Sequence, residues 1–264
     1  MAVITKGATG LTLTTGTNWV GGVAPGAADI ARWASTSSSG NHTGSLTLQG
    51  VQIDGAAGTT VVGYTSGTLT LTQTDAIVFG TSNNASFEVF SSGVIALGSG
   101  NRNFKITGAA GSRNQVLVFQ TNGSLTGSGT LTIIDAAAGA LPRRQVVFGA
   151  AHTGFTGTVV LDGNVELLAW NTSQTCLTAA NITVNGDLCV LRATATGTTL
   201  GASGRTLTIN NDVILGLEPW TIASNVADHS AACDARSAAR CLGRKVPCCK
   251  GLPFRCCFES FHSH

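Results

Sequence analysis

Three copies of one short pattern decide the fold class: residues 160–165 read VLDGNV, residues 183–188 read TVNGDL and residues 208–213 read TINNDV. The copies are offset by 23 and then by 25 residues. In each copy, two apolar or hydroxyl residues lead into a corner of Asp, Asn and Gly, and a fresh apolar run follows. A repeat of about 20–25 residues that contains only strand and corner has the size of one solenoid coil. The pattern therefore predicts stacked coils whose corners form a column.

Strand-like runs extend this pattern through the chain. Val, Ile, Leu and Phe alternate with Thr, Ser or Asn at 45–48, 67–72, 129–133, 157–161 and 205–209. Alternation with period two and many β-branched residues predicts strands with one buried face. No stretch before residue 225 has the spacing of an amphipathic helix. We therefore predict an all-β body.

The corners supply the first candidate site. We expect a ladder of corner side chains along the stack, formed by Asp162, Asn164, Asn185, Asp187, Asn210 and Asp212. Asp and Asn tolerate corner geometry and bond to nearby backbone, which is the interpretation we favour. Oxygen ligands in such a column could instead bind Ca²⁺. The Asp-Gly and Asn-Gly pairs could also close hairpins, so an antiparallel β-sandwich binding module stays open. The strand direction between 155–168 and 182–191 distinguishes the two folds.

Longer motifs carry a family resemblance. Residues 124–133 (SLTGSGTLTI) and 152–168 (HTGFTGTVVLDGNVELL) contain a G-x-G-T-L-T run, a Phe-Thr-Gly step and a V-x-D-G-x-x-x-L strand. In that order they resemble the autotransporter-associated β-strand repeat. Residues 18–33 (NWVGGVAPGAADIARW) resemble the N-W-x-G-G-x-x-P-G-x-x-D motif that often precedes such repeats. Together the resemblances cover most of residues 10–215.

The resemblance implies a passenger domain of a bacterial autotransporter-like surface protein, folded as a right-handed parallel β-helix. Its implied role is structural or adhesive, at the cell surface or after secretion. The implied partners are host-surface or matrix glycans or proteins, and self-association is a further expectation. The first residues lack the long apolar run of a secretory signal. The alternating strands of a C-terminal membrane barrel are not found either. We therefore expect a passenger fragment or a short relative.

The chain divides into three expected parts: an N-terminal cap at 1–34, a β-helix repeat region at 35–225 and a Cys-rich tail at 226–264. A solenoid needs a cap because its terminal coil is an unpaired strand edge. Trp19 and Trp33, which bracket Gly-Gly and Pro-Gly turns, fit that role through burial alone. A carbohydrate-stacking site on Trp19 or Trp33 is the functional alternative.

The tail differs sharply from the body in composition. It holds six of the eight cysteines, at Cys233, Cys241, Cys248, Cys249, Cys256 and Cys257. Three interpretations stay open: a disulfide-bonded knot, a zinc site with His262 or His264, and a non-homologous, irregular or disordered extension. We favour the last. Cys176 and Cys189, in the repeat region, are expected as buried apolar residues.

Composition and charge narrow the function classes. Only 11 % of residues are charged against 43 % hydrophobic, and residues 1–225 carry nine Lys and Arg against ten Asp and Glu. No basic stripe is available to grip phosphates, so we expect no nucleic-acid partner. The chain contains no run of about 18 apolar residues, so we expect no transmembrane segment.

No chemistry-bearing motif stands out. The chain has no nucleophile elbow, phosphate loop or metal-spaced His pair, and we predict no catalytic, cofactor-binding or metal residues. His42, His152 and His229 are scattered and are expected at the surface or in turns. Because most of the 13 acids sit at apparent corners, we expect no enzyme. A carbohydrate-binding or carbohydrate-cleaving β-helix of the tailspike or lyase kind is the alternative, and it would need paired carboxylates on one face.

Overall fold

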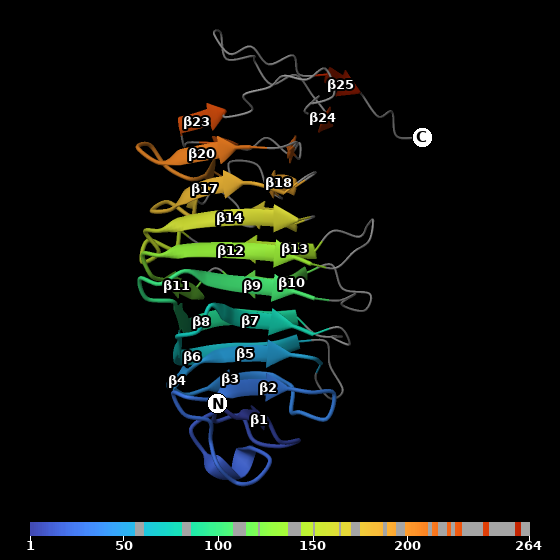
Figure 1. Cartoon of the computed structure of the whole chain (residues 1–264), viewed down its shortest axis with the longest axis vertical. Helices are drawn as coiled ribbons and strands as arrows, with labels where there is room; N and C mark the ends of the chain where they lie inside the picture. The colour runs from blue at the N-terminus through green and yellow to red at the C-terminus, as the bar shows by residue number, and fades with distance from the viewer. Residues whose placement is uncertain are drawn as a thin grey trace.

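The protein is a β-solenoid whose coils stack along one long axis (Figure 1). The computed structural model describes residues 1–55, 61–80, 86–107, 115–120, 122–136, 144–149, 151–163, 165–169, 175–186, 189–193, 199–210, 213–215, 221–222, 225–228, 240–242 and 257–259. Every pair of named strands in these residues is parallel. The all-β parallel solenoid is confirmed, and the antiparallel β-sandwich is wrong.

One wall, which we name sheet 1, contains ten strands (Figure 1). They run in sequence order along the stack, because each coil contributes one strand. From the N-terminal end they are β1 (Val3–Thr5), β2 (Ile30–Trp33), β5 (Gly50–Ile53), β7 (Asp75–Phe79), β9 (Arg102–Ile106), β12 (Thr130–Asp135), β14 (Thr158–Gly163), β17 (Asn181–Val184), β20 (Thr206–Ile209) and β23 (Asn225–Asp228).

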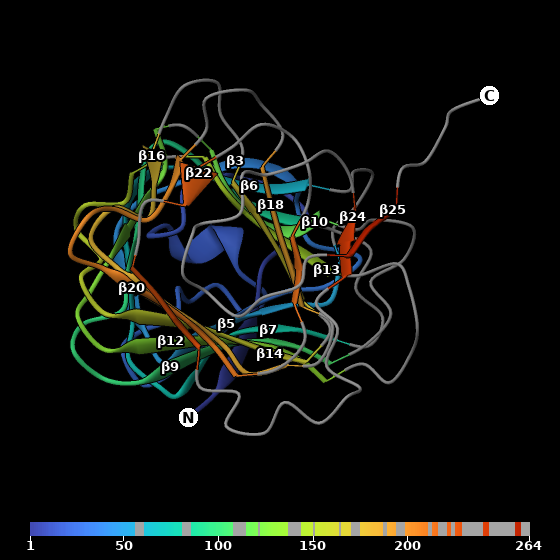
Figure 2. The same cartoon turned by 90° about the horizontal axis from the view of Figure 1, so that it is seen from above.

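The remaining walls return the chain to sheet 1, and the view along the stack shows the strands surrounding a common interior (Figure 2). Sheet 2 contains β3 (Gly40–Thr43), β6 (Val61–Leu71), β8 (Ser86–Ala96), β10 (Gln115–Phe119), β13 (Arg144–Phe148), β15 (Val165–Ala169), β18 (Cys189–Ala193) and β21 (Val213–Leu215) in order. The short strands β4 (Leu46–Leu48) and β11 (Ser124–Thr126) pair with β6 and β8. A third sheet contains β16 (Thr175–Cys176), β19 (Thr199–Leu200) and β22 (Thr221–Ile222).

Columns of apolar side chains fill the interior. Because side chains alternate between the faces of a strand, every second residue of sheet 1 points inward. The register places one buried residue above the next: Ala31, Val51, Ile77, Phe104, Ile133, Leu161 and Val184, each at most 1 % exposed. In sheet 2, the rings of Phe119 and Phe148 stack with centroids 5.4 Å apart. The alternation that predicts strands thus builds one continuous core.

The spacing of the repeats in the sequence equals the offset between paired residues of neighbouring coils. Leu161 pairs with Val184, and Val184 pairs with Ile209, which reproduces the offsets of 23 and 25 residues. The runs at 129–133, 157–161 and 205–209 also coincide with β12, β14 and β20. The right-handed sense of the coil stays a prediction, in line with the strong preference of parallel crossovers.

Glycine is required at the corner after β14. Gly163 has φ +83°, which is costly for residues with a Cβ, and an added Cβ would collide with the carbonyl of Asp135 one coil below. An added Cβ on Gly186, one coil above, would in turn collide with the backbone of Gly163. Close stacking of the corner backbone therefore explains why a glycine follows Asp162 and Asn185.

A short cap closes the N-terminal end. The 3-10 helix η1 (Gly16–Asn18) precedes Trp19, and an antiparallel bridge joins Lys6 to Trp19 beside β1. In the tail, β24 (Arg240–Leu242) pairs with β25 (Cys257–Glu259), so Cys241 and Cys257 lie in strands. Cys233, Cys248, Cys249, Cys256, His262 and His264 lie outside the described residues. No helix in the described part of the chain is long and apolar enough to cross a membrane.

Candidate functional site

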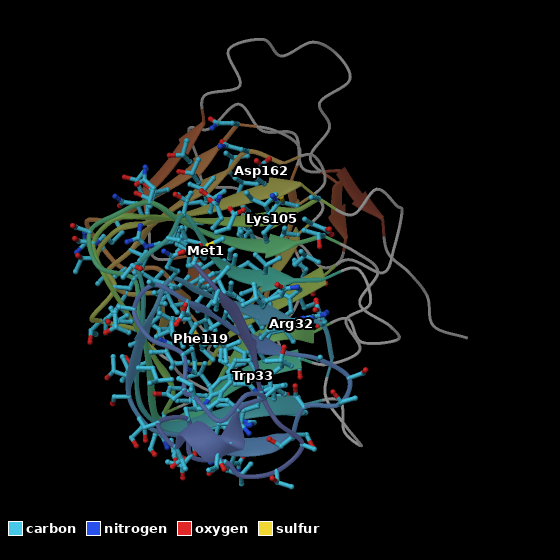
Figure 3. All side chains as sticks on the ribbon, turned by 60° about the horizontal axis from the view of Figure 1, so that its bottom comes forward. Met1, Arg32, Trp33, Lys105, Phe119 and Asp162 are labelled. Atoms are coloured by element: carbon cyan, nitrogen blue, oxygen red, sulfur yellow. The ribbon has the colours of Figure 1, made fainter. Side chains whose placement is uncertain are left out.

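The outer face of sheet 1 carries a row of outward side chains, one from each of six successive strands. All are half-buried except the exposed Asp162. Figure 3 labels its members Arg32, Lys105 and Asp162, and it also labels Trp33 and Phe119, which are buried. In order, the row contains Arg32, Gln52, Val78, Lys105, Ile134 and Asp162.

An ion pair at the N-terminal end of this row fixes its geometry. Arg32 Nε donates to Asp54 Oδ2 over 2.6 Å, and the Asp54 side chain is only 9 % exposed. The Gln52 amide nitrogen lies 3.1 and 3.0 Å from the two carboxylate oxygens. Among the described residues, the Nη atoms of Arg32 have no partner. The pair thus holds the guanidinium with its outer edge open.

Glycine makes room for this carboxylate. Gly80 follows β7 one coil above Asp54, where its N–H donates to the carbonyl of Ile53. A Cβ added to Gly80 would collide with Asp54 Oδ1. Asp54 therefore occupies the space that a side chain at position 80 would need.

A second polar cluster lies further along the same face. Asn103 Nδ2 donates to Asp75 Oδ1 over 2.7 Å, and Lys105 Nζ lies 3.5 Å from Asp75 Oδ2. Both side chains of that ion pair are more than one-third exposed, so it contributes little to stability. Its effect is to neutralise the charge of Asp75 locally.

A trough of about 430 Å³ lies on this face across several coils. In the row, Val78 lies between Gln52 and Lys105. Its side chain is shorter than either of theirs, so the surface is lower there. Apolar and planar polar groups share the lining, which consists of Ile30, Arg32, Val51, Gln52, Asp54, Gln73, Val78, Gly80 and Thr107. Sequence reasoning missed this trough, because its residues come from three strands and from segments next to strands that are far apart in the chain.

Trp19 and Trp33 lie together inside the cap. They are 3 % and 1 % exposed, and their rings meet edge to face with centroids 5.8 Å apart. Trp19 Nε1 donates to the carbonyl of Leu13 over 2.7 Å. Burial is what the cap interpretation requires. A sugar-stacking platform needs an exposed ring face, which neither residue offers in this structure.

The structure shows one contact of the expected corner ladder, between Asn185 and Asn210. Asn210 Nδ2 donates to Asn185 Oδ1 over 2.6 Å, and both side chains are exposed. The backbone N–H of Asn185 donates to the carbonyl of Leu161 in the coil below. Asp162 is exposed at the end of β14. Asn164, Asp187 and Asp212 lie outside the described residues, and the described residues contain no group of three or more metal-ligating side chains.

Two histidines are buried. His42 lies in a strand, which corrects the expectation of a surface or turn position, whereas His152 does begin a turn, since the backbone N–H of Phe155 donates to its carbonyl. His42 is 1 % exposed at an inward position of β3, where its Nδ1 lies 3.0 Å from the carbonyl of Gly63. Because a carbonyl only accepts, Nδ1 carries the proton, and Nε2 accepts from Trp33 Nε1 at 3.4 Å. Desolvation lowers the pKa of His42 to about 4. His229 lies outside the described residues.

His152 is the second buried histidine. It is 4 % exposed and its ring stands edge to face against Phe119 and Phe148. Its Nδ1 accepts from the backbone N–H of Leu125. Desolvation lowers the pKa of His152 to about 4 as well. Alternation in the strand pattern could have flagged His42 as inward, whereas His152 lies in a corner where no period applies.

The carboxylates of the trough face do not form an isolated pair. Asp54 is held by Arg32 and Gln52, and Asp75 by Asn103 and Lys105. What the face can offer is a fixed set of donors and acceptors beside an apolar floor.

Comparison with known proteins identifies no relative: no protein-family model, no curated protein and no solved structure matches the chain.

Proposed function

We propose that this chain is an extracellular structural or adhesive β-helix module, similar in role to an autotransporter passenger domain. The observation that carries the proposal is the unbroken ten-strand parallel sheet, which makes the body a straight, stiff stack. Stacked coils spread stability over nearest neighbours, so such a body serves as a spacer or as a long binding surface.

The surface composition supports the same role. Outward positions of the strands include many Thr, Ser, Asn and Gln side chains, and the body has a nearly balanced charge. A polar face of low charge favours contact with glycans or proteins over contact with polyanions. The order of the repeat-like motifs in the sequence points to the same class of surface protein.

A bead assay tests adhesion directly. Beads coated with the full chain are expected to be retained on a cultured epithelial monolayer and on immobilised matrix glycoproteins. Beads coated with an unrelated, non-adhesive β-solenoid of similar length serve as the control. Equal retention of both kinds of bead on every surface would contradict an adhesive role. Antibody labelling of intact cells of the source organism tests the proposed surface location, and labelling only after lysis would contradict it.

Carbohydrate recognition is the second candidate function. The trough on sheet 1 favours it, because a shallow site with fixed planar polar groups suits a polyhydroxylated ligand. For the same site we propose binding without cleavage, since both nearby carboxylates are engaged in ion pairs.

A further inference from the structure

We propose that the trough on sheet 1 is a subsite for a neutral pyranose unit of a glycan chain. This proposal rests on the adhesive role above and makes it specific. Its elements are the low floor at Val78, the polar groups of Arg32, Asp54 and Gln52, and the amide of Gln73, which also lines the trough.

The shape of the trough fits a sugar ring. Its volume of about 430 Å³ lies in the range of small-molecule sites, which is about 300–1,000 Å³. Val78 offers a small aliphatic surface, with Ile30 also in the lining. A pyranose has one face of C–H groups that can pack on such a surface while its hydroxyls point sideways to the polar groups.

The polar groups are fixed and have open positions. Arg32 is held at Nε by Asp54, which leaves Nη1 and Nη2 as donors without a partner among the described residues. Gln52 donates to Asp54, and Gln73 Nε2 donates to the Asp75 carbonyl at 2.7 Å, so each amide presents its oxygen as an acceptor. Adjacent sugar hydroxyls can then donate to one planar group and accept from another.

The charge of the site favours a neutral sugar. Arg32 is balanced by Asp54, and Lys105 beyond the floor is balanced by Asp75. An acidic sugar would gain no net attraction and would place its carboxylate near two existing ones. A neutral ring avoids that repulsion and still uses the full set of donors and acceptors.

The same features predict a weak site. The groups are preorganised, which limits the entropy lost on binding. The trough is shallow, however, and no aromatic ring is part of its lining. We expect a dissociation constant of about 0.1–10 mM for one ring. Repetition along a glycan or across many copies of the protein would raise the effective affinity.

The test is a titration of the full ¹⁵N-labelled chain, followed by NMR, with cellohexaose, maltohexaose and mannohexaose as neutral probes. Hexagalacturonate is the acidic comparator. At least one neutral probe is expected to shift the side-chain amide signals of Gln52 and Gln73 and the Nε signal of Arg32. Absence of binding by every neutral probe up to about 20 mM, or binding of hexagalacturonate alone, would overturn the proposal.

A matched pair of variants locates the site. Val78→Gln raises the floor and should weaken binding at least about ten-fold. Ile134→Gln makes the same kind of change in the same row, two coils away, and should bind as the parent does. Gln73→Ala supplies a second loss-of-binding variant if Val78→Gln fails to fold. Unchanged affinity of a folded Val78→Gln or Gln73→Ala chain would overturn the location.

The bead assay and the titration distinguish failure of the two proposals. If sugar binding fails while coated beads adhere, the sugar subsite is overturned and adhesion uses another face. If sugar binds but coated beads do not adhere, the proposed adhesive function is contradicted instead.

Discussion

The side-chain amide of Asn210 donates a 2.6 Å hydrogen bond to Asn185 Oδ1, one coil below. The residue before each of them, Val184 and Ile209, forms a register pair of β17 and β20. The amide contact therefore continues the strand register into the corner. Because both side chains are exposed, such a pair contributes about 0.2–1 kcal/mol.

Replacing each asparagine by aspartate, singly and together, tests this contact. Asn185→Asp leaves an acceptor for Asn210, and Asn210→Asp allows the Asn185 amide to rotate and donate. Each single variant should change the free energy of unfolding by less than about 0.5 kcal/mol. The double variant places two carboxylates together and should lose about 1 kcal/mol, measured by urea denaturation and reduced by added salt. Strictly additive effects would show that the two side chains do not interact.

Gly80→Ala should destabilise the protein through Asp54. The added Cβ collides with the carboxylate, which must move away from Arg32, at a cost of about 1–3 kcal/mol. In the background of Asp54→Ala the collision is absent, so the further cost of Gly80→Ala should be much smaller. Gly26→Ala is the control, since its Cβ would meet only Asp29 Oδ2 at 3.8 Å. Equal costs of Gly80→Ala in both backgrounds would refute the steric explanation.

His152 should make stability depend on acid pH. Its folded pKa of about 4 lies below the ordinary value of 6.5 because burial disfavours the charged ring. Protonation therefore favours the unfolded chain, so stability is fully present above pH 6.5 and is lost as the pH falls toward 4. The loss from this residue is on the order of 3 kcal/mol, and His42 adds a loss of the same sign.

His152→Asn isolates that contribution. Asn keeps an acceptor for the Leu125 N–H and tolerates the positive φ of 46° at this position. The variant loses ring packing and is less stable at pH 7, but it should show roughly half the parent's loss between pH 6.5 and 4. Urea midpoints across this range measure the slope. A slope equal to that of the parent would mean that His152 does not titrate on unfolding.

The cap should protect its own end of the stack. Trp33→Ala removes a side chain that packs on Trp19, His42 and Phe87, and should cost about 3–5 kcal/mol. Since coils contact mainly their neighbours, hydrogen exchange should speed up most within residues 1–55. Leu207→Ala, buried at the other end, should instead affect β17 and β20. A uniform rise in exchange in both variants would contradict local stability.

The sequence by itself determined the all-β class and the register of the later coils. Strict in-out alternation defines which residues enter the core, and corners of constant composition mark each coil at Leu161, Val184 and Ile209. Strand direction was not encoded in the turn pairs, because Asp-Gly and Asn-Gly serve hairpins and corners equally well.

Only the tertiary structure decided which outward residues meet. In sheet 1, the offset between register partners varies from 19 residues for Leu207 and Val226 to 29 for Phe104 and Ile133. Corners of different length cause this variation, and local alternation says nothing about it. The contact of Arg32 with Asp54 and the place of Val78 between Gln52 and Lys105 therefore depend on how many residues each corner holds. Alternation assigns a side chain to the core or the surface; the path of the corners assigns its neighbours.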